Sequence, residues 1–575
     1  MSFKSSDVKD GMRREFNIEI IMDDGIILRA DIFRPDDNET HPVILTYGPY
    51  GKGLAFQDGY PDAWLAMTSQ HPDTVYGSSN LYQSWELVDP EKWVPDGYIC
   101  LRIDSRGTGC SEGFVDPFSP REMKDLYDCI EWAGIQEWSN GKVGLNGISY
   151  YSQNGWAVAS MNPPHLAAFC CWEGCGDWYR DATHQGGIMS VFWPEWFENQ
   201  VVSVQYGRGE RGYKSRVTGE NVSGEITCSD KELAENRLDF GDVLQQNTLD
   251  GTYYRERSSV YENIRCPILS AANWGGIGLH TRGNFEGFMR AGTEQKWLET
   301  HGLEHWTHFY TDYGVALQKK FLGFFLKGED NGWMEMPKVL LNVRHPGNKF
   351  VPRAENEWPL ARTNWKKYYL TAEYGLTEKE ENAFGNLTYE AMGDGLTFLT
   401  APFEEEMELC GPMAAKLFVS SDTEDADIFL ALRLFNPNMQ EVTFIGSNDP
   451  NTPLSLGWLR ASHRKLDENI SRFYMPYHTH DEIQMLKPGE IYPLDIEVLP
   501  TSIVIPLGYR LALSIRGRDY ETAAEKVPYG KNNYSGVGPH RHTEARDRKP
   551  EIYNNNVTLH LNRECRPYIL LPVIP

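Results

Sequence analysis

Ser149, a serine set among small residues, is the side chain best suited to covalent chemistry in this sequence. Residues 143–155 read VGLNGISYYSQNG: an apolar run, Gly147 two residues before the serine, and small polar residues that open a helix. This pattern is typical of a nucleophile elbow, where a short parallel strand ends in a tight turn that exposes a serine oxygen at a helix N-terminus. The usual pattern has a second glycine where this chain has Tyr151. Ser149 is therefore a candidate nucleophile, and an ordinary strand-to-helix turn is the alternative.

The segments around Ser149 predict a parallel sheet that carries helices on both faces. A hairpin is expected over 16–34, turning at Asp24-Gly25, and a helix with one apolar face over 121–134. Short apolar segments with strand character occur at 42–48, 98–104, 142–147, 167–174 and 266–274. Short apolar strands separated by helices indicate a buried parallel sheet. Reactive groups in such a sheet lie at the carboxyl ends of the strands, which is where Ser149 falls.

The pattern of the sequence changes twice along the chain. Aromatic and charged segments between 177 and 260 interrupt the alternation and suggest an inserted helical cap over the site. After Gly332 the chain consists of short alternating strands separated by Gly, Pro and Asp, which predicts an antiparallel sandwich. We expect an α/β fold whose three parts are a sheet domain at 1–176 and 261–332, a cap at 177–260, and a β-sandwich at 333–575.

Composition argues against several classes of partner. The chain has 575 residues and a formal net charge of −26, which disfavours nucleic acid and anionic membranes. Neither a signal-peptide core nor an 18-residue apolar stretch is present, so a cytoplasmic location is expected. Ten scattered cysteines, the tightest group being Cys170, Cys171 and Cys175, have no histidine at ligand spacing and are expected to be free thiols. No motif indicates a metal, nucleotide or flavin, so no cofactor is predicted.

Further segments extend this pattern to nearly the whole chain. They are GPYGKG (48–53), RIDSRGTGCSEG (102–113), NWGG (273–276), HGLEHWTH (301–308), QKKFLGFFLKG (318–328), GWLRASHRKLD (457–467), PGEIYPLDIEVLPTS (488–502) and PLGYRLALSIRGRD (506–519). In this order they resemble the cocaine esterase and X-prolyl dipeptidyl-peptidase family of serine hydrolases. The resemblance implies an α/β-hydrolase domain with an inserted helical cap, followed by a C-terminal β jelly-roll sandwich.

The resemblance also implies a catalytic base and a pair of oxyanion donors. The family places its histidine just after the last strand of the sheet, which favours His305 over the competing His308. His301 is expected to lie within that strand in a structural role. One oxyanion donor is the backbone N–H of Tyr150, the residue after the nucleophile. The other is a tyrosine hydroxyl from a Pro-Tyr pair, which corresponds here to Tyr50.

The acid of the triad is where this chain departs from the family. The family has aspartate two residues after a tryptophan, and here Trp274 is followed by Gly275 and Gly276. Another carboxylate could orient the histidine, a Ser–His dyad could suffice, or hydrolysis could be lost. Glu173 is the best replacement, because it ends the neighbouring strand and adjacent strands are only about 5 Å apart.

Other charged residues near the site have competing interpretations. A salt bridge with Arg180 is the alternative role for Glu173, while Asp177 and Glu304 are weaker candidates for the acid. Asp104 and Arg106, in a motif shared with the family, are interpreted as structural. His280 and Arg282 follow the altered acid loop, and the sequence does not decide between packing and substrate contact.

The resulting hypothesis is a serine hydrolase that cleaves an ester or amide of a mid-sized, fairly apolar small molecule through an acyl-enzyme. The alternatives are an X-Pro peptidase, a family member recruited for lyase, cyclase or acyl-transfer chemistry, and a binding protein without turnover. The expected partner is a small-molecule substrate, with neither nucleic acid nor membrane, and the chain could form a homodimer.

Overall fold

The N-terminal half of the chain is built on one large sheet. The computed structural model describes residues 4–380, 385–523, 527–529 and 532–575. The strands of this sheet are β1 (Ser5–Lys9), β2 (Met12–Ile21), β3 (Ile27–Arg34), β4 (His41–Gly48), β5 (Ile99–Asp104), β6 (Ser139–Ile148), β7 (Leu166–Trp172), β10 (Ile268–Asn273), β11 (Lys296–His301), β12 (Val339–His345) and β13 (Lys349–Glu355). They lie in the order β1-β2-β3-β5-β4-β6-β7-β10-β11-β12-β13, and all pairs from β5 to β12 are parallel. The predicted parallel sheet is confirmed.

Helices cover both faces of this sheet because its central strands are apolar on both sides. Val43 and Leu45 of β4 lie in a core that includes α4 (Pro120–Gly134) and α5 (Tyr150–Ala159). Ile44 points the other way, into the core that includes α12 (Asp312–Leu322). Helix α10 (Thr281–Arg290) packs on β10. The strand end that precedes Ser149 is therefore packed between helices on both faces of the sheet.

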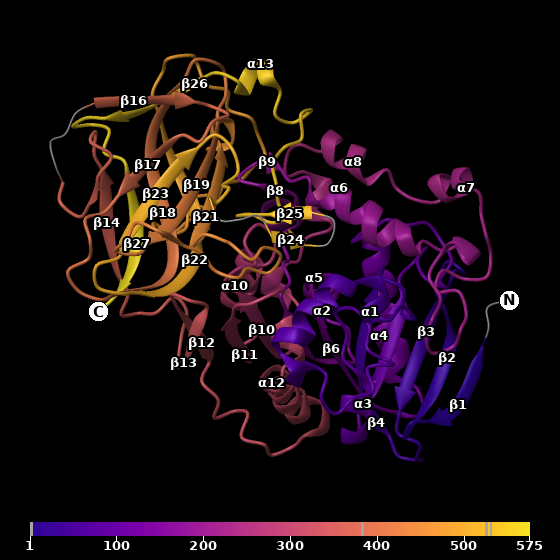
Figure 1. Cartoon of the computed structure of the whole chain (residues 1–575). Helices are drawn as coiled ribbons and strands as arrows, with labels where there is room; N and C mark the ends of the chain where they lie inside the picture. Colours follow the sequence, from indigo (N-terminus) through magenta and orange to yellow (C-terminus); the bar gives the residue numbers. More distant parts are fainter. Residues whose placement is uncertain (1–3, 381–384, 524–526, 530–531) are drawn as a thin grey trace.

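The cap consists of short pieces rather than long helices. They are η3 (Trp178–Thr183), β8 (His184–Gln185), β9 (Ile188–Met189), α6 (Phe192–Trp196), η4 (Phe197–Val201), η5 (Val202–Val204), η6 (Gly209–Arg211), α7 (Asp230–Glu235), α8 (Phe240–Gln246) and α9 (Thr252–Arg255). Figure 1 shows α6, α7 and α8 together over one end of the α/β domain. Aromatic residues of this segment join the core of that domain, among them Trp178, Trp193 and Trp196. The cap is therefore an integral cover over the strand ends.

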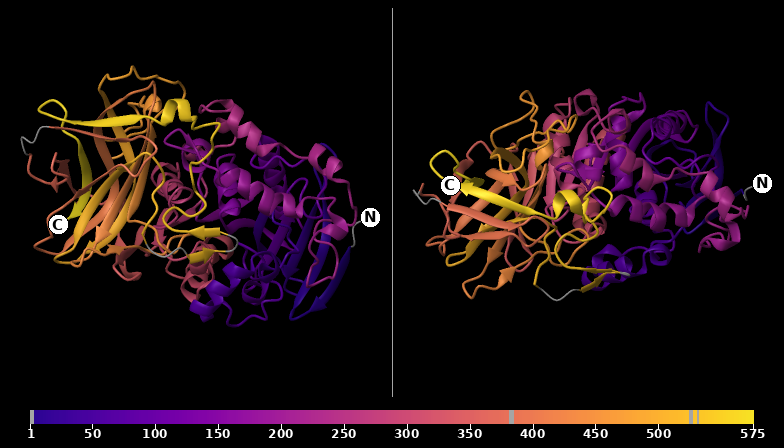
Figure 2. Two further views of the ribbon diagram at one scale, coloured as in Figure 1. Left: turned by 45° about the horizontal axis from the view of Figure 1, so that its top comes forward. Right: turned by 90° about the horizontal axis from the view of Figure 1, so that it is seen from above.

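The C-terminal part is an antiparallel β-sandwich. Its strands are β14 (Asn364–Leu370), β15 (Leu376–Thr377), β16 (Gly385–Glu390), β17 (Leu396–Leu399), β18 (Met407–Ser421), β19 (Asp427–Phe435), β20 (Glu441–Val442), β21 (Ser455–Arg460), β22 (Tyr492–Ile505), β23 (Arg510–Arg516), β26 (Asn556–Leu561) and β27 (Tyr568–Ile574). Leu, Ile and Val side chains from these strands form a separate core. Figures 1 and 2 show this sandwich, in orange and yellow, packed beside the α/β domain in every view.

The two domains share strand β12. It pairs in parallel with β11 of the α/β sheet and meets β22 of the sandwich at Arg344 and Ile503. The sandwich therefore lies close to the carboxyl end of β11, where the predicted histidine follows. None of the helices in the described part of the chain is both long and apolar enough to cross a bilayer.

Candidate active site

Ser149 occupies a strained turn between β6 and α5. Its backbone has φ 56° and ψ −112°, a region that costs a non-glycine residue on the order of 1–3 kcal/mol. A side chain at Gly147 would place its Cβ 2.7 Å from Tyr151 Cβ and 3.2 Å from the Glu86 carbonyl oxygen. Glycine is therefore required there, as the sequence predicted. The surrounding structure holds the strained turn that exposes the serine.

The Ser149 hydroxyl is bonded to a histidine other than the predicted one. Ser149 Oγ lies 3.1 Å from His280 Nε2. His280 stands at the start of α10, in a tight turn where the Gly276 carbonyl accepts its backbone N–H. Burial, and then the neighbouring His305, hold the pKa of His280 well below its ordinary value of 6.5. The ring is therefore neutral at neutral pH, and in the tautomer that carries its proton on Nδ1 the Nε2 atom can accept the serine proton.

Glu173 and His305 meet as the sequence proposed. His305 Nδ1 lies 2.8 Å from Glu173 Oε2, and both side chains are buried. Arg180, the alternative partner of Glu173, instead pairs with Asp177 and Asp250, each at 2.9 Å. Glu173, the residue that follows β7, therefore pairs with His305 rather than with Arg180.

His305 does not reach Ser149 because its second nitrogen is occupied. His305 Nε2 lies 3.0 Å from Glu86 Oε1. Burial would lower the pKa of His305, but Glu173 and Glu86 outweigh it and raise that pKa to about 10. The ring stacks on His280, with centroids 5.1 Å apart and planes 13° apart. His305 therefore carries a positive charge and stacks on His280, the histidine that contacts Ser149.

Glu86 is a site residue that the sequence reasoning missed. It lies in an irregular segment where Leu87 pairs with Gly147 and the Glu86 carbonyl accepts the Ile148 N–H. Burial raises the pKa of Glu86 to about 7 against the opposing effect of His305. No local motif signals this placement, because a single long-range pairing with the nucleophile strand creates it.

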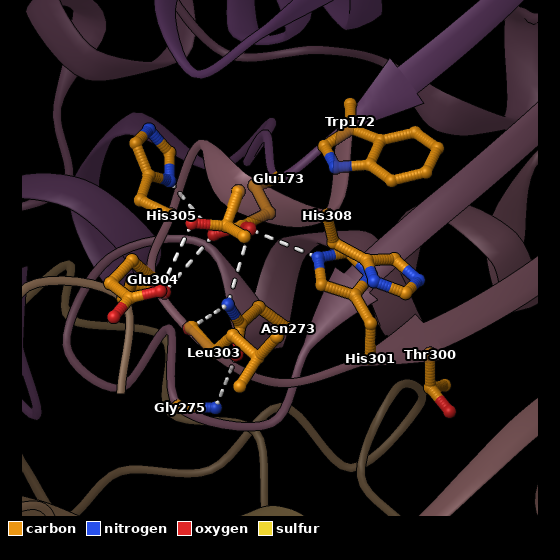
Figure 3. A network of polar contacts seen from close by, with 12 residues as sticks. Trp172, Glu173, Asn273, Gly275, Thr300, His301, Leu303, Glu304, His305 and His308 are labelled. Carbon is orange, nitrogen blue, oxygen red and sulfur yellow. Dashed lines mark hydrogen bonds and ion pairs between the residues drawn. The ribbon is translucent and has the colours of Figure 1, made fainter. Parts of the chain in front are cut away.

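Glu173 is the centre of a buried polar network, shown in Figure 3. His301 Nε2 lies 2.9 Å from Glu173 Oε1, and Asn273 Nδ2 donates to the same oxygen at 3.2 Å. Behind it, Glu299 Oε2 lies 2.7 Å from His301 Nδ1. Burial opposes the charge of Glu173, but His305 and His301 prevail and hold its pKa well below the ordinary value. Carboxylates and imidazoles alternate along this network, so each buried charged group contacts a group of opposite charge.

Of the two predicted oxyanion donors, Tyr150 directly follows Ser149 and Tyr50 packs against the Tyr150 ring. Tyr150 provides the first N–H of α5, next to Ser149. The Tyr50 ring packs against Tyr150 at a centroid distance of 5.9 Å, and its hydroxyl accepts from Trp196 Nε1 at 3.0 Å. Burial, and then Glu86, raise the pKa of Tyr50 well above 10, so the phenol keeps its proton. Both groups can donate to a developing oxyanion.

The remaining sequence candidates bond to partners other than Ser149. His308 Nε2 faces Glu299 at 3.4 Å and Glu304 accepts from Thr307. Asp104 accepts the backbone N–H groups of Lys52 and Cys110, a structural role as expected.

Arg106, in the same motif as Asp104, does not pair with it. It forms ion pairs with Asp125 and Asp24. The motif therefore ties the loop after β5 to α4 and to the turn before β3.

One group of described side chains could offer ligands to a metal ion. Ligand atoms of Glu299, His301 and His308 lie within 4.8 Å of one another. The 2.7 Å contact between Glu299 and His301 already pairs two of these atoms directly. The group is accounted for by ion pairing in the network around Glu173.

Comparison with known proteins places these features in context. The X-Pro dipeptidyl-peptidase (S15) family matches residues 24–310, and the X-Pro dipeptidyl-peptidase C-terminal non-catalytic domain matches residues 331–549. The cocaine esterase of Rhodococcus sp. (strain MB1 Bresler) is 22% identical, over 97% of this chain and 98% of that protein. A putative Xaa-Pro dipeptidyl-peptidase of Rhodopirellula baltica is 20% identical, over 87% of this chain and 82% of its own length.

Solved structures share the whole architecture. A CocE/NonD family hydrolase from Staphylococcus aureus superposes with a TM-score of 0.84 at 29% identity, covering 100% of this chain and 97% of its own. An α-amino acid ester hydrolase superposes with a TM-score of 0.68 at 16% identity, covering 100% and 98%. The likeness includes both the sheet domain and the sandwich.

Proposed function

Because the chain belongs to the X-Pro dipeptidyl-peptidase (S15) family of hydrolases, we propose that it cleaves an ester or amide through an acyl-enzyme on Ser149. The 3.1 Å contact between Ser149 Oγ and His280 Nε2, on a strained strand-to-helix turn, carries this proposal. A serine hydroxyl is a weak nucleophile until a base within hydrogen-bond reach removes its proton. His280 is the histidine in that position.

The reaction proceeds in two halves. Ser149 Oγ attacks the carbonyl carbon while its proton passes to His280 Nε2, and the carbonyl oxygen becomes an oxyanion held by the Tyr150 N–H and the Tyr50 hydroxyl. The tetrahedral intermediate collapses, and the leaving alcohol or amine takes the proton from His280. Water then attacks the acyl-enzyme with His280 again as base, which releases the acid and restores Ser149.

The Glu173–His305 pair influences the Ser149–His280 pair without contacting Ser149. His305 carries a positive charge because its pKa is raised to about 10, and it lies stacked on His280. That charge disfavours protonation of His280, so the imidazolium formed during catalysis is a strong acid toward the leaving group. Glu173 balances the charge of His305 and keeps its ring in place.

Aromatic side chains support a fairly apolar substrate. Tyr50 and Trp196 pack against Tyr150, the residue after Ser149, with centroid distances of 5.8 to 6.3 Å among the three rings. Such faces bind apolar and aromatic acyl groups better than charged ones. An X-Pro peptide is the second candidate, favoured by the family match.

A panel of substrates tests both candidates. p-Nitrophenyl esters of short and aromatic acids should be hydrolysed, with Gly-Pro-p-nitroanilide as the probe for dipeptidyl-peptidase action. Ser149→Ala should abolish turnover of every substrate used. Ser160→Ala, which removes a hydroxyl that only donates to Ala157 at the end of α5, is the matched control and should be unaffected. Unchanged activity of Ser149→Ala on all substrates would refute the proposal.

A further inference from the structure

The loop between β20 and β21 reaches from the sandwich into the active site. Phe444 and Thr452 pair across its base, and the Gly446 N–H donates to the Asp449 carbonyl. Asp449 in turn accepts the N–H groups of Gly536 and Gly538 at 2.7 and 2.9 Å. The loop therefore has a defined shape within the sandwich.

Ser447, near the tip of this loop, touches three elements of the site. Its hydroxyl donates to Glu173 Oε2 at 3.0 Å. Its carbonyl accepts the backbone N–H of His305, and its own N–H donates to the Gly275 carbonyl, each at 3.0 Å. Ser447 is only 3% exposed, so these bonds are shielded from water. One residue thus ties together the acid, the histidine and the loop after β10.

The site is shaped to admit this loop. A Cβ at Gly275 would lie 2.4 Å from the Cα of Gly446, and a Cβ at Gly276 would lie 3.3 Å from Ser447 Oγ. The glycine that replaces the family aspartate therefore borders the hydroxyl that binds Glu173. A carboxylate at 276 would compete with Glu173 for the same space and the same donor.

We infer that Ser447 is a positioning residue, through which the sandwich domain fixes the Glu173–His305 pair for catalysis. The inference rests on the proposed function, because it concerns the acid and histidine of the same site. It assigns a part in the reaction to the domain that matches a C-terminal non-catalytic domain in the family comparison. Ser447 contacts neither substrate nor the reacting atoms, so its effect must pass through Glu173 and His305.

Ser447→Ala tests the inference against a matched control. Ser455→Ala in β21 removes another buried hydroxyl of the sandwich, which donates to the Leu499 carbonyl at 2.6 Å and not to Glu173. Losing a hydrogen bond to a charged acceptor should lower kcat of Ser447→Ala about tenfold with KM little changed. Ser455→Ala should keep the kcat of the wild type even if its thermal stability falls.

A double variant separates a positioning role from a loss of stability. If Ser447 acts through Glu173, adding Ser447→Ala to Glu173→Gln should have a much smaller effect on kcat than adding it to the wild type. Additive effects, or equal kcat for Ser447→Ala and Ser455→Ala, would overturn the inference. If Ser149→Ala itself keeps activity, the proposed function fails instead, so the two failures are distinguishable.

Discussion

At the scale of single residues, the site separates two tasks that one histidine usually combines. His280 contacts Ser149, and His305 contacts Glu173. The two rings stack 5.1 Å apart, so the charge on one governs the basicity of the other. The pH dependence of activity therefore identifies the base.

If His280 is the base, the acid limb of the kcat/KM profile lies below pH 6.5. The base must be neutral, and the pKa of His280 is held well below 6.5 by burial and by His305. A base with the raised pKa of His305, about 10, would instead place that limb near pH 10. Initial rates on an activated ester from pH 4.5 to 10.5 measure this. Activity that rises only above pH 8 would assign the base to His305.

The proposed role of Tyr50 as an oxyanion donor gives a second prediction at this scale. Tyr50→Phe removes one hydroxyl donor and should lower kcat on the order of 10²- to 10³-fold, with KM little changed. Tyr368→Phe is the control, because the Tyr368 hydroxyl donates to Glu378 within the sandwich. Equal kcat for Tyr50→Phe and the wild type would remove Tyr50 from the oxyanion site.

At the scale of elements, strand periodicity and turn chemistry predict much of the site. The elbow at Ser149, Tyr50 near α5 and the contact of Glu173 with His305 follow from residues at the ends of neighbouring parallel strands. The contacts of His280 and Glu86 could not be predicted in the same way. They depend on how an irregular turn and a single long-range pairing fold back onto the sheet, and no repeating pattern encodes either.

The turn that carries Ser149 tolerates no side chain at Gly147. Gly147→Ala would bring its Cβ to 2.7 Å from Tyr151 Cβ, so α5 or Glu86 must move. We expect about 1–3 kcal/mol lower free energy of unfolding and strongly reduced esterase activity. Gly241→Ala, within α8, is the control. Its Cβ would lie 3.6 Å from Pro194 Cβ, which is an ordinary van der Waals contact. Equal activity and stability of Gly147→Ala and the wild type would contradict the tight turn.

At the scale of the whole molecule, three parts of the chain converge on one buried charged network. The sheet contributes Glu173 and His301, the loop after β11 contributes His305, and the sandwich contributes Ser447. A network of buried ions couples the stability of the fold to pH, because its pKa values differ between the folded and unfolded chain.

Stability should fall as pH rises through the alkaline range. Acidic neighbours overcome burial and raise the pKa of His301 to about 9 and that of His305 to about 10, from 6.5. Groups with a raised pKa stabilise the fold fully below pH 6.5, and this contribution is lost as pH rises toward 10. Urea unfolding at pH 6.5, 8 and 9.5 should show this decline. His301→Gln lacks one titrating group, so its free energy of unfolding should decline less steeply with pH. The same slope as in the wild type would contradict the raised pKa of His301.

The measurement that tests the central claim most directly is intact-mass analysis after reaction with a fluorophosphonate. We predict one adduct per chain in the wild type and none in Ser149→Ala. Labelling should be slowed far more by His280→Ala than by His305→Ala, because the Ser149 hydroxyl is bonded to His280. An unlabelled wild type, or labelling that needs His305 and proceeds normally without His280, would contradict the account.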